Sequence, residues 1–91
     1  MNHARNTFLV KNKLGLHARA AAKLTQLASR FSCEVQAGND EQMVNAKSVM
    51  GLLLLCGAKG TSLIVEANGD GAEDAVKAIG ELIDARFGEE E

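Results

Sequence analysis

The chain has 91 residues, of which 46% are hydrophobic, and a formal net charge of −2 at pH 7. A chain this short builds one small core and has little room for a deep, enclosed active site. The slightly acidic balance and the near absence of aromatic residues argue against nucleic-acid binding. No apolar run approaches the roughly 20 residues of a membrane span, and the polar N-terminus does not resemble a signal peptide. We therefore expect a cytoplasmic protein that does not enter membranes.

The two cysteines, Cys33 and Cys56, lie far apart and form no CxxC pair. This spacing matches neither a metal site nor a redox motif. We interpret both as small buried hydrophobic residues in a reducing compartment. The sequence therefore predicts no metal and no cofactor.

The spacing of apolar residues predicts seven elements. In chain order these are a strand at 7–11, a helix at 18–30, a hairpin with strands around 33–37 and 44–46, a short helix at 49–55, a strand at 62–67 and a helix at 72–87. The last element follows a helical period without a gap as far as Gly88. His3 is interpreted as an exposed terminal residue. The helices each have one apolar stripe, so we expect two layers, a sheet with helices on one face.

The short helix has a leucine-rich sequence that two turns cannot bury completely. Ser48 stands directly before it, in a position suited to an N-cap. If Leu52 and Leu55 face the core, an apolar patch remains on or near the surface. Its members are Val49, Met50 and Leu53. The alternative is that all these side chains are core, because leucine-rich runs are usually buried.

The stretch from Leu14 to Ala20 leads through a glycine turn into an alanine-rich helix, with His17 at the joint. A helix start presents unpaired N–H groups and the positive end of the macrodipole, so it favours an anion. A neutral imidazole has a lone pair that can accept a group, and Arg19 adds a planar cation suited to phosphate oxygens. The pattern predicts a site that receives a phosphoryl group. The alternative is that His17 is only a tolerated polar residue or a cap.

Two motifs together resemble the HPr family, the histidine-containing phosphocarriers of the bacterial phosphoenolpyruvate-dependent sugar phosphotransferase system. They are Gly15-Leu16-His17-Ala18-Arg19 and Val44-Asn45-Ala46-Lys47-Ser48-Val49-Met50-Gly51. The resemblance covers nearly the whole chain and implies one domain over residues 1–91. It implies an α+β fold of topology βαββαβα, an open-faced β-sandwich. Its four-stranded antiparallel sheet has the order 1-4-2-3 and is covered on one face by three helices.

The resemblance also implies a stoichiometric phosphoryl carrier rather than an enzyme. Enzyme I would phosphorylate Nδ1 of His17, and the group would pass to a histidine of an enzyme IIA domain. Arg19 would balance the phosphate charge, and the backbone N–H groups of Ala18 and Arg19 would bind it. We expect a monomer that docks on its partners through a surface comprising Ala18, Ala22, Val49, Met50 and Leu53.

Ser48 resembles a serine that a dedicated HPr kinase/phosphatase modifies in part of the family. A phosphate would add about −1.5 to −2 charges beside the docking surface, so it should weaken docking more than folding. The alternative is that Ser48 only caps its helix, which is worth ~1 kcal/mol over alanine.

Two residues depart from the family pattern. Ala20 stands where many members have proline, so the first turn loses stiffness but gains a free N–H. Leu14 stands where many members have Ser, Asn or Thr, whose oxygen can contact the histidine ring. Leucine cannot make that contact.

Three classes of function remain open. The first is a carrier in sugar uptake, with the carrier of the nitrogen-linked branch as a close relative. The second is a regulatory binding module that acts through the apolar patch. The third is a small metal-binding α/β domain, which lacks the cysteine or histidine pair at ligand spacing that would support it.

Overall fold

The computed structural model describes residues 2–55 and 57–91; the expectation for Cys56 lies outside them. The order of strands and helices is the predicted βαββαβα. The elements are β1 (His3–Leu9), α1 (Ala18–Ala28), β2 (Glu34–Gly38), β3 (Met43–Asn45), α2 (Val49–Leu53), β4 (Ser62–Asn68), α3 (Ala72–Asp84) and a short 3₁₀ helix η1 (Arg86–Gly88). The helices α1 and α2 each end two residues earlier than predicted.

The four strands form one antiparallel sheet in the order β1-β4-β2-β3. Strand β4 lies between β1 and β2, with Leu9 opposite Ser62 at one end and His3 opposite Asn68 at the other. Strand β3 pairs with β2 alone. The sheet order that the family resemblance implies is therefore confirmed.

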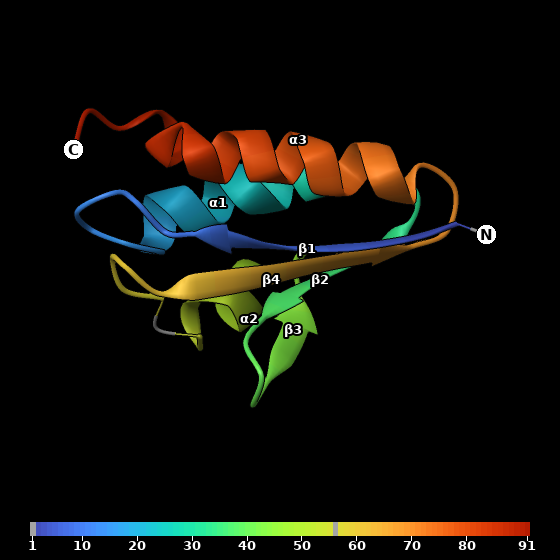
Figure 1. Ribbon diagram of the computed structural model, residues 1–91, viewed down its shortest axis with the longest axis horizontal. Helices are drawn as coiled ribbons and strands as arrows, with labels where there is room; N and C mark the ends of the chain where they lie inside the picture. The colour runs from blue at the N-terminus through green and yellow to red at the C-terminus, as the bar shows by residue number, and fades with distance from the viewer. Residues whose placement is uncertain (1, 56) are drawn as a thin grey trace.

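One face of the sheet carries the core. Along β4 the residues that point to this face are Leu63, Val65 and Ala67, and they belong to the same buried cluster as side chains from all three helices. The helices α1 and α3 lie side by side along the sheet, and α2 packs against α1 and β3 (Figure 1). The largest fully buried aliphatic side chains of the helices are Leu24, Leu52, Ile79 and Ile83. The helical stripes predicted from the sequence are thus the ones that pack on the sheet, as expected for an open-faced sandwich.

Strand β1 begins at His3, four residues earlier than the predicted strand. The apolar alternation starts only near Phe8, but residues 3–6 complete a backbone ladder with β4. His3 is exposed, as expected, but it belongs to the strand, and its Nε2 lies 2.6 Å from Oε2 of Glu66 on β4. Backbone pairing, which side-chain periodicity does not report, sets the length of this strand.

The last helix was predicted to run to Gly88, and that prediction is wrong. Helix α3 ends at Asp84, and the next turn is left-handed, with φ of 57° at Arg86, 54° at Phe87 and 79° at Gly88. Residues in this conformation reverse the chain after a helix. The Phe87 side chain is fully buried. It therefore continues the helical spacing of apolar residues in the sequence, although its backbone is part of the chain reversal and not of the helix.

The reversal brings residues 89–91 back to the loop between β1 and α1. The backbone N–H of Lys13 donates to the carbonyl of Glu91 at 2.9 Å. In Figure 1 the C-terminal end and this loop lie at the same end of the molecule. The acidic tail is therefore part of the folded structure, next to the start of α1.

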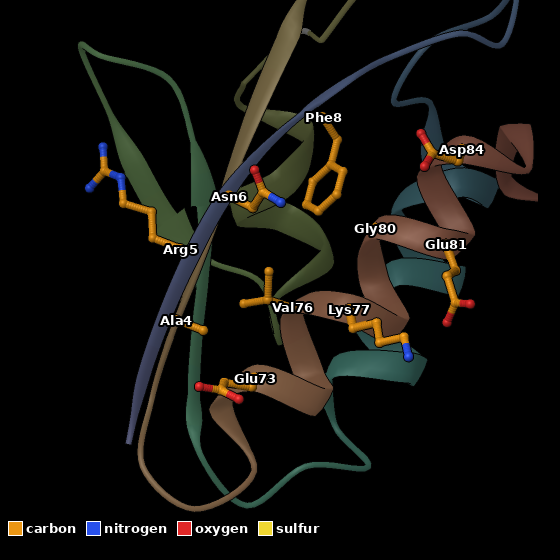
Figure 2. A pocket seen from close by; sticks show the side chains of 10 residues that line it. All are labelled: Ala4, Arg5, Asn6, Phe8, Glu73, Val76, Lys77, Gly80, Glu81 and Asp84. Atoms are coloured by element: carbon orange, nitrogen blue, oxygen red, sulfur yellow. The ribbon is translucent and has the colours of Figure 1, made fainter. Parts of the chain in front are cut away.

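A cavity of about 410 Å³ lies between β1 and α3, and none of the predicted site residues lines it (Figure 2). Phe8 extends from β1 toward Gly80 in the middle of α3. A Cβ at residue 80 would stand 2.3 Å from Cε1 of Phe8. Gly80 therefore allows the ring to approach the helix backbone closely, which makes this a packing feature.

Candidate functional site

His17 is the N-cap of α1. Its backbone is extended, with φ −80° and ψ 178°, and its ring Nδ1 accepts a hydrogen bond from the backbone N–H of Arg19 at 3.2 Å. The preceding turn is fixed by Gly15, which has φ 66° and lies so close to Gly57 that a Cβ would meet its carbonyl oxygen at 2.3 Å. The N–H of Leu16 donates to that same carbonyl at 2.7 Å. A glycine turn clamped by a neighbouring loop therefore positions the histidine, and its role as a cap is confirmed.

The second ring nitrogen of His17 contacts the tail. Nε2 forms a hydrogen bond with Oε2 of Glu89, although the two residues are 72 positions apart. The other carboxylate oxygen, Oε1, accepts a hydrogen bond from Nδ2 of Asn12 at 2.9 Å, and the same amide donates to the carbonyl of Gly15 at 2.7 Å. Asn12 is fully buried. A buried amide therefore holds the carboxylate against the ring.

These two contacts define the tautomer of the neutral ring. A backbone N–H only donates and an ionised carboxylate only accepts, so Nδ1 must offer its lone pair and Nε2 must carry the proton. The Asn12 hydrogen bond, together with the His17 ring and the Arg19 charge, lowers the pKa of Glu89, against a smaller opposing effect of burial. Glu89 is accordingly ionised at neutral pH. The nucleophilic lone pair of His17 is directed at the start of α1.

Charged side chains of both signs lie close to the pair. Ala18 and Arg19 are exposed in the first turn of α1. A cavity of about 480 Å³ beside the site is lined by Lys13, Arg19 and Lys23 and by residues of the tail. Lys23 anchors the tail, because its Nζ donates to the carbonyl of Phe87 at 2.7 Å. Lys13 also contacts the tail, since its Nζ lies 3.7 Å from Oε2 of Glu91.

The predicted docking residues of α2 lie at the surface. Met50 is 73% exposed, Leu53 is also exposed, and Val49 is partly buried. Leu52 is fully buried, but Met50 and Leu53 are exposed, so the alternative in which the whole leucine-rich run is core is wrong. On α1, which packs against α2, Ala18 is exposed and Ala22 is partly buried.

Two exposed leucines were missed. Leu54 is 68% exposed and Leu14 is 69% exposed. Leu54 follows the last residue of α2, where the chain leaves the helix and the helical pattern no longer predicts which side is buried. Leu14 lines the same cavity as Arg19 and Glu89, whereas Leu54 extends the exposed apolar surface of α2.

Ser48 caps α2, as predicted. Its Oγ accepts a hydrogen bond from the N–H of Gly51 at 3.2 Å. The Nζ of its neighbour Lys47 donates to the carbonyl of Phe31 at 2.7 Å. The segment that enters α2 is therefore fixed on both sides.

Glu89 is the site residue that sequence reasoning missed. It belongs to the run Glu89-Glu90-Glu91, and no local motif marks it. The left-handed turn at Arg86 and Phe87 that returns it to the site is unusual for residues other than glycine. Only the three-dimensional path of the chain brings it to His17.

Among the described residues, none of the helices has both the length and the apolar character needed to cross a membrane. The same part of the chain contains no group of three His, Cys, Asp or Glu side chains arranged to hold a metal ion.

An imidazole oriented from both sides at a helix start, with an apolar surface next to it, is typical of a small domain that presents a reactive histidine to other proteins. Residues 4–85 match the family model for the PTS HPr component phosphorylation site. The chain belongs to the HPr family, the phosphocarrier proteins of the phosphotransferase system.

Individual relatives are similar over most of their length. The phosphocarrier protein HPr of Neisseria meningitidis serogroup A is 49% identical over 80 residues, which cover 88% of this chain and 90% of the relative. The phosphocarrier protein NPr of Shewanella violacea is 46% identical over 78 residues, 86% of each chain. The crystal structure of HPr-C-His from Thermoanaerobacter tengcongensis matches with a TM-score of 0.92 and 44% identity, covering 97% of this chain and 99% of that one. The family and fold expected from the two sequence motifs are confirmed.

Proposed function

We propose that this protein accepts a phosphoryl group on Nδ1 of His17 from phosphorylated enzyme I and passes it to a histidine of an enzyme IIA domain in sugar transport. The observation that carries the proposal is the ring geometry of His17. Its Nδ1 accepts the Arg19 N–H at 3.2 Å, and its Nε2 is hydrogen-bonded to Glu89. Membership of the phosphocarrier family supplies the chemistry for which such a lone pair is suited.

In the proposed transfer, the lone pair of Nδ1 attacks phosphorus while the donor's nitrogen–phosphorus bond breaks. The bond electrons return to the donor's ring. The N–H of Arg19, no longer bonded to Nδ1, then donates to a phosphate oxygen, together with the N–H of Ala18. The Arg19 guanidinium balances the added negative charge. The reverse sequence on the next partner restores the free ring, so the protein acts as a stoichiometric carrier and not as an enzyme.

The proposed docking surface consists of Ala18, Ala22, Val49, Met50 and Leu53. Exposed Met50 suits a surface that several partners share, because a methionine side chain adapts its shape at low cost. Ser48 caps the helix that carries this surface, and a phosphate there would place negative charge beside it. We propose that this serine is a regulatory site for a kinase of the HPr kinase/phosphatase type.

We propose that the protein is a single domain spanning residues 1–91 and that it acts as a monomer in the cytoplasm. The buried free thiol of Cys33 suits a reducing compartment.

A second candidate is the nitrogen-linked branch, because the NPr relative is almost as similar as the HPr relative. The two branches differ in their phosphoryl donor. Initial rates of phosphorylation by enzyme I of each branch, measured at equal concentrations, would distinguish them. A faster reaction with the nitrogen-branch enzyme would exclude the sugar assignment.

The decisive experiment follows labelled phosphate from phosphoenolpyruvate through enzyme I to the protein. The chain offers a matched control, because His3 is the only other histidine. We expect acid-labile label on the parent and on His3→Ala, and none on His17→Ala. A folded parent that takes up no label would overturn the proposal and favour the binding-module function.

A further inference from the structure

We propose that Glu89, held by Asn12, is a positioning residue that fixes the proton on Nε2 of His17 before transfer and keeps it there after Nδ1 has accepted the phosphoryl group. This inference rests on the proposed function of His17. It assigns a specific task to a tail residue that lies outside both sequence motifs of the site.

The first part of the argument is geometric. The side chains of His17 and Glu89 are only 24% and 15% exposed, and their contact involves Nε2 alone. Asn12 is buried, and its side-chain amide nitrogen donates hydrogen bonds both to Oε1 of Glu89 and to the carbonyl of Gly15. The carboxylate is therefore tied to the same turn that sets the helix start. This arrangement fixes ring rotation as well as the proton, so that Nδ1 faces the N–H of Arg19.

The second part concerns the missing contact at Leu14. A side-chain oxygen at residue 14 cannot orient the imidazole here, because leucine has none. The Leu14 side chain is 69% exposed and turned to solvent. Glu89 approaches the ring from the tail and provides an acceptor for Nε2–H. The ring in this chain is thus oriented from a different segment, by a charged group.

The third part follows the charges through the reaction. When the Nδ1 lone pair bonds to phosphorus, the donor's bond electrons leave with the donor, and Nε2 of His17 retains its proton. The phosphorylated ring is then a cation facing an ionised carboxylate. On transfer to the next partner the nitrogen–phosphorus electrons return to this positively charged ring, which is a better leaving group than a neutral one. Glu89 therefore supports both acceptance and release.

Other charges act on this pair from every neighbouring element. Cations and tail carboxylates line the same adjacent cavity, and Arg19 and Glu89 are close enough for their charges to interact. The charged groups to consider are Lys13 from the loop, Arg19 and Lys23 from α1, and Glu90 and Glu91 from the tail. Among the described residues, the ring of His17 is hydrogen-bonded to the side chain of Glu89 and to the backbone N–H of Arg19, but to none of these other charged side chains. The effect of the Glu89 carboxylate is therefore separable by substitution.

The test compares the parent chain, Glu89→Gln and Glu90→Gln, each with ¹⁵N-labelled histidine. Glu90 is exposed, so its substitution removes the same charge from the same segment without touching the ring. Three quantities are measured: the NMR signal of the Nε2 proton in the free protein, the rate of phosphorylation by enzyme I, and the pH profile of phosphohistidine hydrolysis.

We expect Glu89→Gln to lose the slowly exchanging, downfield Nε2 proton signal and to accept phosphate about tenfold more slowly, which is the lower end of the loss seen when a metal-binding histidine loses its carboxylate partner. Its hydrolysis profile should move to lower pH, because the cationic phosphorylated ring loses its counter-charge. Glu90→Gln should stay within twofold of the parent. A residue that only anchored the tail would change the unfolding midpoint but neither the proton signal nor the pH profile.

An unchanged proton signal and pH profile in a phosphorylated Glu89→Gln protein would overturn the inference and leave His17 as the carrier site. Equal effects of both substitutions would also overturn it, since they would reflect tail charge alone. Absence of label on the parent would instead overturn the proposed function, and the proton signal of the free protein would still decide whether Glu89 holds the ring.

Discussion

Ser48 separates folding from docking, because two substitutions there are expected to act on different properties. Its Oγ accepts the N–H of Gly51 at 3.2 Å and caps a helix that runs only from Val49 to Leu53. Alanine removes this acceptor. Aspartate keeps an acceptor and adds a negative charge, which a helix start favours. Met50, which is 73% exposed, lies two residues further on, so the same charge borders the proposed docking surface.

The expected magnitudes follow from these contacts. Losing the cap should destabilise the protein by about 1 kcal/mol, which corresponds to a fall of about 1 M in the urea midpoint for a domain of this size. The free energy of unfolding of Ser48→Asp should lie within about 0.5 kcal/mol of that of the parent, because the cap is retained. An unpaired charge at the edge of an interface that costs about 1.4 kcal/mol weakens binding tenfold. Ser48→Asp should therefore bind enzyme I about tenfold more weakly, while Ser48→Ala binds like the parent.

Urea unfolding followed by circular dichroism measures the first property, and calorimetric titration with enzyme I measures the second. Ser48→Ala should be the less stable variant in urea, and Ser48→Asp should be the weaker binder of enzyme I. A Ser48→Asp protein that is as unstable as Ser48→Ala but binds enzyme I normally would refute the reasoning. It would mean that the serine supports the fold in a way that a carboxylate cannot replace and that the docking surface lies elsewhere.

Three further predictions concern the tail and the core. The pKa of Glu89 is lowered in the folded protein. The contribution of its carboxylate to stability is therefore complete above the ordinary carboxyl pKa and is lost as pH falls through the lowered pKa. The difference in Tm between the parent and Glu89→Gln should shrink on acidification. Gly80→Ala should destabilise by about 1–3 kcal/mol despite the better helix propensity of alanine, because its Cβ would stand 2.3 Å from the Phe8 ring, and a urea double-mutant cycle with Phe8→Ala should show that coupling. Leu52→Ala should lower the free energy of unfolding in urea by about 2–5 kcal/mol, since its side chain is fully buried.

Much of the fold was predictable because the core is patterned. Ala21, Leu24 and Ala28 recur at helical spacing, and the structure buries all three on the sheet. Val35 and Ala37 alternate with polar neighbours, and both are buried from β2. A side chain that must face the core constrains the local period of its element. The sheet order came from the family resemblance, because periodicity does not report which strands are neighbours.

Element ends were less predictable, for a physical reason that differs at each end of the chain. At His3 the strand continues past the apolar alternation because β4 offers backbone partners. At Asp84 the helix stops before the apolar period does, because the left-handed residues Arg86 and Phe87 turn the chain while the Phe87 side chain remains buried. In both places backbone geometry, rather than side-chain pattern, determines where the element ends.

The site shows the same division. His17, Arg19 and the helix start are adjacent in the sequence, so local reasoning brings them together. Glu89 reaches the ring only because the chain reverses at the left-handed residues Arg86 and Phe87. The buried Phe87 side chain and the hydrogen bond from Lys23 to the Phe87 carbonyl, at 2.7 Å, hold this reversal in place. Which ring nitrogen of His17 is free to accept a group therefore depends on the long-range contact with Glu89. The position of His17 in the fold depends on a short motif. A relative that keeps the motif but has a tail with a different path would present the same histidine with a ring oriented by other groups.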